Sequence, residues 1–177
     1  SGVSWHHEII VLDNRFISER VNQIRNWNME FIQGDILDKN LMDKICRDAD
    51  VVHHLAGITA VPRTKSESSI TQDERIKEVG EIGTQNILDA ISDKCKIIMP
   101  SSHVVYEGIE SVKMKIKESE QTNPVLSYSK SKAINEEQLK NSGKNYIILR
   151  LGSVYGYSSD TARIDIMANL FAKTASQ

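Results

Sequence analysis

The sequence lacks several features that mark particular classes of protein. No hydrophobic run approaches the roughly 20 apolar residues that a membrane span requires, and no signal-peptide pattern opens the chain. The two cysteines, Cys46 and Cys95, are too few for a disulfide framework, so we expect reduced, semi-buried thiols in a cytoplasmic protein. The net charge of −2 gives no electrostatic reason to expect a nucleic-acid partner.

What is present suits one ordinary globular domain, because 177 residues with 40% apolar content are enough to form a core. The sequence begins at Ser1-Gly2 without an initiator methionine, as expected of a processed or truncated chain. Short apolar runs rich in β-branched residues alternate with helical patterns, which predicts βαβ units and a parallel sheet. The runs Val51-Val52, Ile97-Ile98 and Ile147-Ile148 are typical of strands that are covered on both faces.

The expected elements can be bounded from these patterns. Strands are predicted at Glu8–Leu12, Glu30–Gln33, Asp50–His54, Lys96–Met99 and Tyr146–Leu149. Helices are predicted over roughly 38–47, 69–92, 126–142 and 162–174. Gly80 and Gly83 fall inside the long second helix, where glycine costs stability, so a close packing contact is the expected reason for them.

The strongest chemical signal is a tyrosine and a lysine four residues apart, Tyr128 and Lys132, which share one helix face. A nearby ammonium favours the phenolate, so a tyrosine that normally titrates near ~10 can act as a base closer to neutrality. The preceding strand delivers Ser101 and Ser102, and a serine there can hydrogen-bond the same substrate oxygen. These groups suit removal of a hydroxyl proton while a hydride leaves the carbon.

Other strand ends carry polar or small residues, and ligands of open α/β sheets bind beyond such ends. Asp13 follows the first strand and could accept both hydroxyls of an adenosine ribose, which favours NAD over NADP. Asp35 follows the second and could accept from an adenine amino group; for both aspartates a simple turn is the alternative. The third strand ends in a histidine pair, of which His54 is interpreted as a packed structural residue, so no metal is expected.

Seven stretches occur in a shared order and at suitable spacing: VLDN, GDILD, VVHHLAG, GTQNILDA, IIMPSSHVVYEG, the Tyr-x-x-x-Lys element and LRLGSVYG. This series resembles the extended short-chain dehydrogenase/reductase family, in particular its NAD-dependent nucleotide-sugar epimerases and dehydratases. The resemblance implies an α/β fold, a Rossmann-type doubly wound parallel sheet in three αβα layers, truncated at its N-terminal strand. It also implies an incomplete NAD-binding core at 1–157 and the start of a substrate-binding region at 158–177.

The resemblance further implies a role for individual residues. Tyr128 becomes the base, Lys132 its electrostatic partner at the nicotinamide ribose, and Ser102 the catalytic hydroxyl. Predicted cofactor contacts, besides Tyr128 and Lys132, are Asp13, Asp35, Ile36, Leu55, Ala56, Gly57, Ser101, Leu151 and Ser153. Predicted substrate contacts are Ser102, His103, Arg163 and Asn169, with a solvated helix surface as an equal alternative for the last two. The implied partners are a nucleotide sugar and a second copy of the chain, without nucleic acid or membrane.

Two departures from the family pattern affect the prediction. The 177 residues contain no Gly-x-x-Gly-x-x-Gly turn, whose amides hold the dinucleotide pyrophosphate in the family, so weak NAD binding and little turnover are expected of this chain. The family's 4,6-dehydratases place an Asp-Glu pair after the catalytic hydroxyl residue, where this sequence has His103 and Val104. Valine cannot transfer a proton, which favours an epimerase or reductase over a dehydratase.

Smaller departures occur at Gly80 and Ser153, where the family usually has asparagine. Gly80 puts the hydrogen bonding near the active site in doubt. Ser153 puts in doubt how tightly a substrate is held. The sequence therefore predicts a nucleotide-sugar epimerase that uses NAD. A non-catalytic nucleotide-binding or regulatory protein of the same fold, and an NAD-dependent ketone reductase or alcohol dehydrogenase, remain as alternatives.

Overall fold

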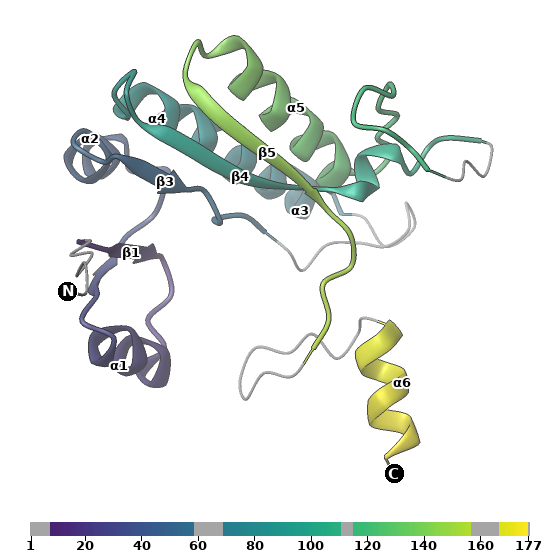
Figure 1. Ribbon diagram of the computed structural model, residues 1–177, viewed down its shortest axis with the longest axis horizontal. Helices are drawn as coiled ribbons and strands as arrows, with labels where there is room; N and C mark the ends of the chain where they lie inside the picture. The colour runs from purple at the N-terminus through teal and green to yellow at the C-terminus, as the bar shows by residue number, and fades with distance from the viewer. Residues whose placement is uncertain (1–7, 59–68, 111–114, 157–166, 177) are drawn as a thin grey trace, which may run out of the picture.

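The structure, a computed structural model, describes residues 8–58, 69–110, 115–156 and 167–176. Strands and helices alternate along these residues, which confirms the predicted α/β class (Figure 1). The elements are β1 Ile10–Asp13, α1 Ser18–Asn26, β2 Glu30–Gln33, α2 Lys39–Cys46, β3 Val51–His53, α3 Ile70–Lys77, a π-helical turn Glu78–Ile82, α4 Gly83–Ala90, β4 Lys96–Ser102, a 3₁₀ turn His103–Tyr106, α5 Ser127–Asn141, β5 Asn145–Leu151 and α6 Met167–Ala175. Among the described residues, no helix is long and apolar enough to cross a membrane.

All five predicted strands are present within two residues of their expected bounds, except that β4 continues three residues further, to Ser102. Helix α1 was not predicted, for a physical reason: its sequence is largely polar, only Val21 is buried, and its N-cap residue Ile17 offers no side-chain cap. Periodicity and capping are the signals by which a helix is found in a sequence, and here both are weak.

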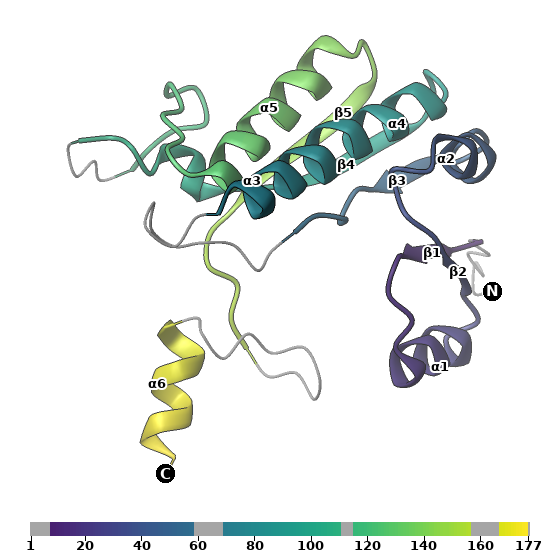
Figure 2. The ribbon, with the colours of Figure 1, turned by 180° about the vertical axis from the view of Figure 1, so that it is seen from behind.

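The strands form two parallel sheets rather than one. One contains β1 and β2, in register from Ile10 opposite Glu30, and the other has the order β3-β4-β5. Within the described residues, no strand pairing joins β1 or β2 to β3. In both views α1 lies on the opposite side of the strands from α2, α4 and α5 (Figures 1 and 2).

The core fills the space between the larger sheet and helices α2, α4 and α5. Alternate residues of β4 point into it, so that Ile97 and Met99 are fully buried. The opposite face is open over the described residues: Val51 of β3 is 47% exposed and Ile147 of β5 is 39% exposed. The prediction that these two strands are covered on both faces is therefore wrong for this part of the chain.

The two glycines of the long helix lie where neighbouring elements approach closely. A Cβ atom at Gly80 would overlap Oγ of Ser131 on α5, and a Cβ atom at Gly83 would overlap the Ile36 side chain. The predicted packing reason for both glycines is confirmed. The helix also changes to a π-helical turn at Glu78–Ile82, between α3 and α4.

The overlap at Gly83 makes a measurable prediction. Gly83→Ala is expected to lower the free energy of unfolding by about 1–3 kcal/mol, because buried Ile36 has little room to move. The matched control is Gly152→Ala, since a Cβ atom there meets nothing within 4 Å. Urea denaturation of both variants measures the difference, and Ile36→Val should reduce the cost of Gly83→Ala. Equal stability of the two alanine variants would refute this packing role.

Candidate active site

Tyr128 and Lys132 lie on the first two turns of α5. The Lys132 Nζ atom is 5.8 Å from the centroid of the Tyr128 ring, which confirms that the two residues share a helix face. The same ammonium donates a hydrogen bond of 2.9 Å to the carbonyl oxygen of Pro100 on β4. Burial lowers the pKa of Lys132. A partly desolvated cation therefore lies between the tyrosine and the end of β4.

The end of β4 presents two serines on opposite sides of the sheet, as the pleat requires. Ser101 is buried on the helix side, where its hydroxyl donates a 2.6 Å hydrogen bond to Glu136. Ser102 is half-buried on the other side and caps the 3₁₀ turn, its Oγ accepting from the amide of Val104 at 3.4 Å. Pro100 precedes Ser102 by two residues on β4. The hydrogen bond from Lys132 to Pro100 therefore holds α5 close to the strand end that carries Ser102.

A buried ion pair under these residues was not predicted from the sequence. Glu136 is 1% exposed and receives two short hydrogen bonds from Arg150 of β5, at 2.9 Å from Nε and 2.6 Å from Nη2. Arg150 also donates to the hydroxyl of Tyr106 and, at 2.9 Å, to the carbonyl oxygen of Glu118. Through Ser101 and Tyr106, the pair connects α5, β4 and β5 to the turn after Ser102. The available signal was the position of Glu136 four residues after Lys132, on the same helix face.

The pKa of Glu136 shows that the pair is ionised. Burial by itself would raise the pKa of this carboxyl group. Hydrogen bonds from Arg150 and Ser101, together with the positive charges of Arg150 and Lys140, outweigh burial and hold the pKa below its ordinary value. The carboxylate is thus a fixed negative charge one turn beyond Lys132.

Asp13 and Asp35 end neighbouring parallel strands, β1 and β2, at one edge of the small sheet. Asp13 is exposed, and its Oδ1 accepts the amide of Arg15 at 2.8 Å. Asp35 accepts the amide of Leu37 at 3.0 Å and is linked to Asn14, the neighbour of Asp13, by a 3.3 Å hydrogen bond. Asp35 also pairs with Arg75 of α3 at 3.5 Å, whereas the side chain of Ile36 is buried.

The residues after β3 divide between the core and the surface. His54 is 5% exposed, and its Nε2 atom lies 2.9 Å from Oγ1 of Thr84, which confirms its interpretation as a packed histidine. Leu55 is 72% exposed, and Ala56 and Gly57 are exposed as well. Within the described ranges, no group of three or more His, Cys, Asp or Glu side chains is arranged to hold a metal ion.

His54 makes stability depend on pH. Burial, helped by the positive charge of Lys132, lowers its pKa from 6.5 to about 4. At this position the unfolded chain therefore binds a proton more readily than the folded chain. The free energy of unfolding is thus unaffected by His54 above about pH 6.5 and falls, by up to about 3 kcal/mol, as pH falls toward 4. Denaturation of His54→Gln at several pH values should show a shallower decline. His103→Gln, at an exposed histidine, is the control, and equal slopes in both variants would contradict the assignment.

The remaining predicted contacts lie beyond β5. Leu151 and Ser153 are exposed, and Nδ1 of His103 lies 3.1 Å from the carbonyl oxygen of Leu151, which joins the turn after Ser102 to the end of β5. Asn169 of α6 accepts the amide of Gly156 through Oδ1 at 3.2 Å. Arg163 falls outside the described residues.

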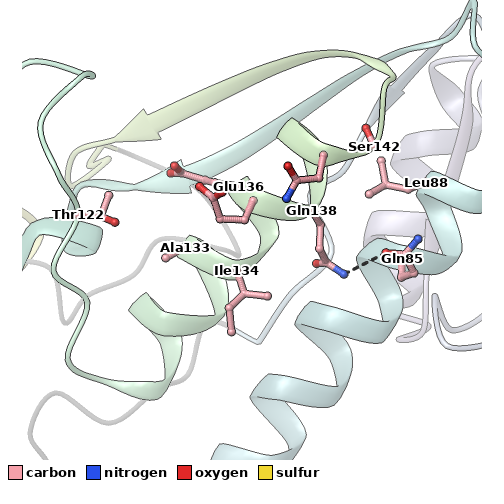
Figure 3. A pocket seen from close by; sticks show the side chains of 10 residues that line it. Gln85, Leu88, Thr122, Ala133, Ile134, Glu136, Gln138 and Ser142 are labelled. Atoms are coloured by element: carbon pink, nitrogen blue, oxygen red, sulfur yellow. Dashed lines mark hydrogen bonds between the residues drawn. The ribbon is translucent and has the colours of Figure 1, made fainter.

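A hollow lies elsewhere, on the outer surface of α4 and α5. It measures about 480 Å³, and its lining includes Ile134, Gln138 and Asn141 of α5 with Gln85 and Leu88 of α4 (Figure 3). A 3.4 Å hydrogen bond from Gln138 to Gln85 bridges the two helices there. Tyr128, Lys132 and Ser102 do not line it. Glu136 of the buried ion pair does line it, so the hollow reaches that pair from the helix surface without including Tyr128, Lys132 or Ser102.

Comparison with known proteins identifies the family. The sequence profile of the NAD dependent epimerase/dehydratase family matches residues 3–176. A putative UDP-glucose 4-epimerase of Methanocaldococcus jannaschii is 33% identical over 162 residues, covering 88% of this chain and 50% of that protein. The UDP-glucose 4-epimerase of Lactobacillus helveticus is 30% identical over 161 residues, covering 87% of this chain and 46% of that protein.

A solved structure supports the same assignment. The UDP-glucose 4-epimerase of Thermotoga maritima, crystallised with UDP-glucose, has a TM-score of 0.69 at 26% identity and covers 87% of this chain and 50% of its own. The chain thus spans about half the length of the relatives that it matches. The Rossmann-type fold predicted from the motifs is confirmed, and the chain belongs to the NAD-dependent epimerase/dehydratase family.

Proposed function

We propose that this chain is the NAD-binding core of a nucleotide-sugar epimerase, in which Tyr128 is the base. The observation that carries the proposal is the arrangement at the end of β4. There Lys132 contacts both the ring of Tyr128 and the carbonyl of Pro100, next to the strand end that carries Ser102. Because the chain spans half the length of its relatives, the activity is proposed for the whole protein that contains it.

The proposed chemistry divides between the three side chains. Tyr128 removes the proton from a sugar hydroxyl, and the Lys132 ammonium favours the phenolate form that this requires. Ser102 donates a hydrogen bond to the substrate oxygen, stabilising it as it becomes a carbonyl oxygen. When bound, NAD supplies the acceptor and donor of hydride. The keto sugar then turns over in the site so that hydride returns to its other face, and Tyr128 gives the proton back to the same oxygen, which completes epimerisation without net oxidation.

The residues present fit NAD at its adenosine and along its middle. Asp13 and Asp35, at one edge of the small sheet, are the proposed acceptors for the adenosine hydroxyl and amino groups, and the negative Asp13 disfavours a 2′-phosphate. A Cβ atom at Gly57 would meet nothing within 4 Å, which leaves space for a ligand beside the exposed Leu55–Gly57 wall. The 177 residues contain no glycine-rich turn whose amides could donate hydrogen bonds to the pyrophosphate. We therefore propose that this chain by itself binds NAD weakly and turns over little.

Epimerisation is favoured over dehydration by the residues that follow Ser102. The positions of the dehydratase acid–base pair hold His103 and Val104, and the valine side chain carries no titratable group. His103 is engaged at the surface with the carbonyl oxygen of Leu151. Water elimination needs both an acid and a base on the sugar ring, and only one of these two side chains can exchange a proton.

A homodimer is proposed through the outer surface of α3, α4 and α5. Ile70, Ile82 and Ile134 are exposed on the long helix and on α5, at 79%, 51% and 40%. The hollow between α4 and α5 lies on this surface and could receive side chains of a second copy (Figure 3). Exposed aliphatic side chains on adjacent helices are typical of an interaction surface.

Two alternative functions make different predictions. A non-catalytic nucleotide-binding protein does not require Tyr128, Lys132 and Ser102 together, which counts against it. Calorimetry of this chain with NAD tests that alternative, because tight binding without the glycine-rich turn would indicate a different pocket. A ketone reductase or alcohol dehydrogenase would keep the three side chains but change the redox state of its substrate.

The deciding experiment incubates the whole protein with a panel of UDP- and dTDP-sugars and analyses the products. We expect the 4-epimer of one sugar nucleotide, without net formation of NADH. Net NADH would indicate a dehydrogenase, and a 4-keto-6-deoxy sugar would indicate a dehydratase. No product from any sugar would favour the non-catalytic alternative.

A further inference from the structure

Glu107 connects the turn that follows Ser102 to the helix that carries Tyr128. It ends the 3₁₀ turn His103–Tyr106, whose N-cap is Ser102. Its Oε1 atom accepts the amides of Val125 at 2.8 Å and Leu126 at 2.6 Å, and also the hydroxyl of Ser129. All three donors belong to the start of α5.

Helix α5 has no cap of its own at this end. Leu126 occupies the N-cap position with no side-chain hydrogen bond, and the first turn contains no acidic residue. In a capping box, a carboxylate or amide at the third helical position accepts the N-cap amide. That position holds Ser129, and Glu107 accepts the Leu126 amide from another part of the chain instead. Tyr128 is the second residue of the turn that is capped in this way.

Glu107 is ionised in this arrangement. Burial alone would raise its pKa, but hydrogen bonds from Leu126, Ser129 and Val125 and the positive charge of Lys130 outweigh burial and lower the pKa. Hydrogen bonds to an ionised acceptor are roughly twice as strong as neutral ones. The positive end of the helix dipole, at the N-terminus of α5, also stabilises the carboxylate.

A second set of contacts joins the turn after Ser102 to the residues that lead into α5. The amide of Asn123 donates to Val105 at 2.8 Å, and the amide of Gly108 donates to Asn123 at 2.9 Å. A Cβ atom at Gly108 would lie 2.6 Å from the carbonyl oxygen of Asn123 and 2.8 Å from Cγ2 of Val125. The turn after Ser102 therefore lies flush against the segment that leads into α5.

We propose that Glu107 is a positioning residue that sets the Tyr128 phenol relative to the Ser102 hydroxyl, an inference that rests on the proposed function. It lies five residues after Ser102, and it caps the turn of α5 that contains Tyr128. Both side chains must meet one substrate oxygen, so a small shift of the helix start separates them. Misplacement by about 1 Å can cost roughly 100-fold in rate.

The test compares Glu107→Ala with Glu107→Gln in the whole protein. The alanine variant removes the shared acceptor, so its kcat is expected to fall about 10- to 100-fold while KM for the sugar nucleotide stays within about twofold. The glutamine variant keeps an acceptor oxygen in the same place and should recover most of the loss. Glu110→Ala, at an exposed glutamate three residues further on, is the matched control.

Amide hydrogen exchange separates positioning from general destabilisation. In this chain, Glu107→Ala should increase exchange at Val125 and Leu126 without changing exchange in β4 or β5. An unchanged kcat in Glu107→Ala, or a loss explained by the fraction of unfolded protein, would overturn the positioning role. Full activity of Tyr128→Phe would instead overturn the proposed function, and this inference with it.

Discussion

Replacing Tyr128 by Phe is expected to lower kcat of the whole protein by about 10²- to 10⁴-fold, the range typical of a lost general base. The substitution removes one oxygen atom and keeps the ring beside Lys132, so the packing of α5 should be preserved. Initial-rate kinetics with the preferred sugar nucleotide measure the effect. Calorimetry should show NAD affinity within a few-fold of the unmodified protein.

The matched control is Tyr146→Phe, at an exposed tyrosine on β5. It makes the same chemical change outside the candidate site, and its kcat should remain unchanged. Equal rates for the Tyr128 and Tyr146 variants would remove Tyr128 from the mechanism.

Replacing Arg150 by Met is expected to lower the free energy of unfolding by about 3–5 kcal/mol at neutral pH, because it leaves the buried Glu136 carboxylate with only Lys140, at 3.8 Å, as a cation. The double variant Arg150→Met, Glu136→Gln removes both charges and should recover much of that loss. Arg150→Lys should be intermediate, because an ammonium cannot reproduce the paired hydrogen bonds of the guanidinium. Urea denaturation of the three variants measures these differences.

Arg75 offers a matched control on the surface. It pairs with Glu78 at 2.5 Å and with Asp35 at 3.5 Å, but all three side chains are a third to nearly half exposed, so Arg75→Met should cost about 1 kcal/mol or less. If the Arg150 and Arg75 variants lose similar stability, the buried pair does not hold the strands and α5 together as described.

The sequence predicted those parts of the structure that local patterns specify. The β-branched runs located β3, β4 and β5, and the spacing of Tyr128 and Lys132 placed both side chains on one helix face. The seven ordered motifs identified the family, whose profile matches nearly the whole chain. The roles of Asp13 and Asp35, inferred from the rule that ligands bind beyond strand ends, stay predictions.

The parts that were missed depend on contacts between distant segments. Glu136 and Arg150 are far apart in sequence and form one ion pair only after β5 lies beside β4. Glu107 reaches α5 across a segment that no periodicity describes. The exposure of Val51 and Ile147 likewise depends on what covers the sheet, whereas the sequence shows only that these residues are apolar.

A crystal structure of the whole protein with NAD and its preferred sugar nucleotide would test the account most directly. We predict that the phenol oxygen of Tyr128 and the hydroxyl of Ser102 both lie within hydrogen-bonding distance, about 2.5–3.2 Å, of a single sugar hydroxyl. A sugar bound with that hydroxyl remote from both oxygens would contradict the account.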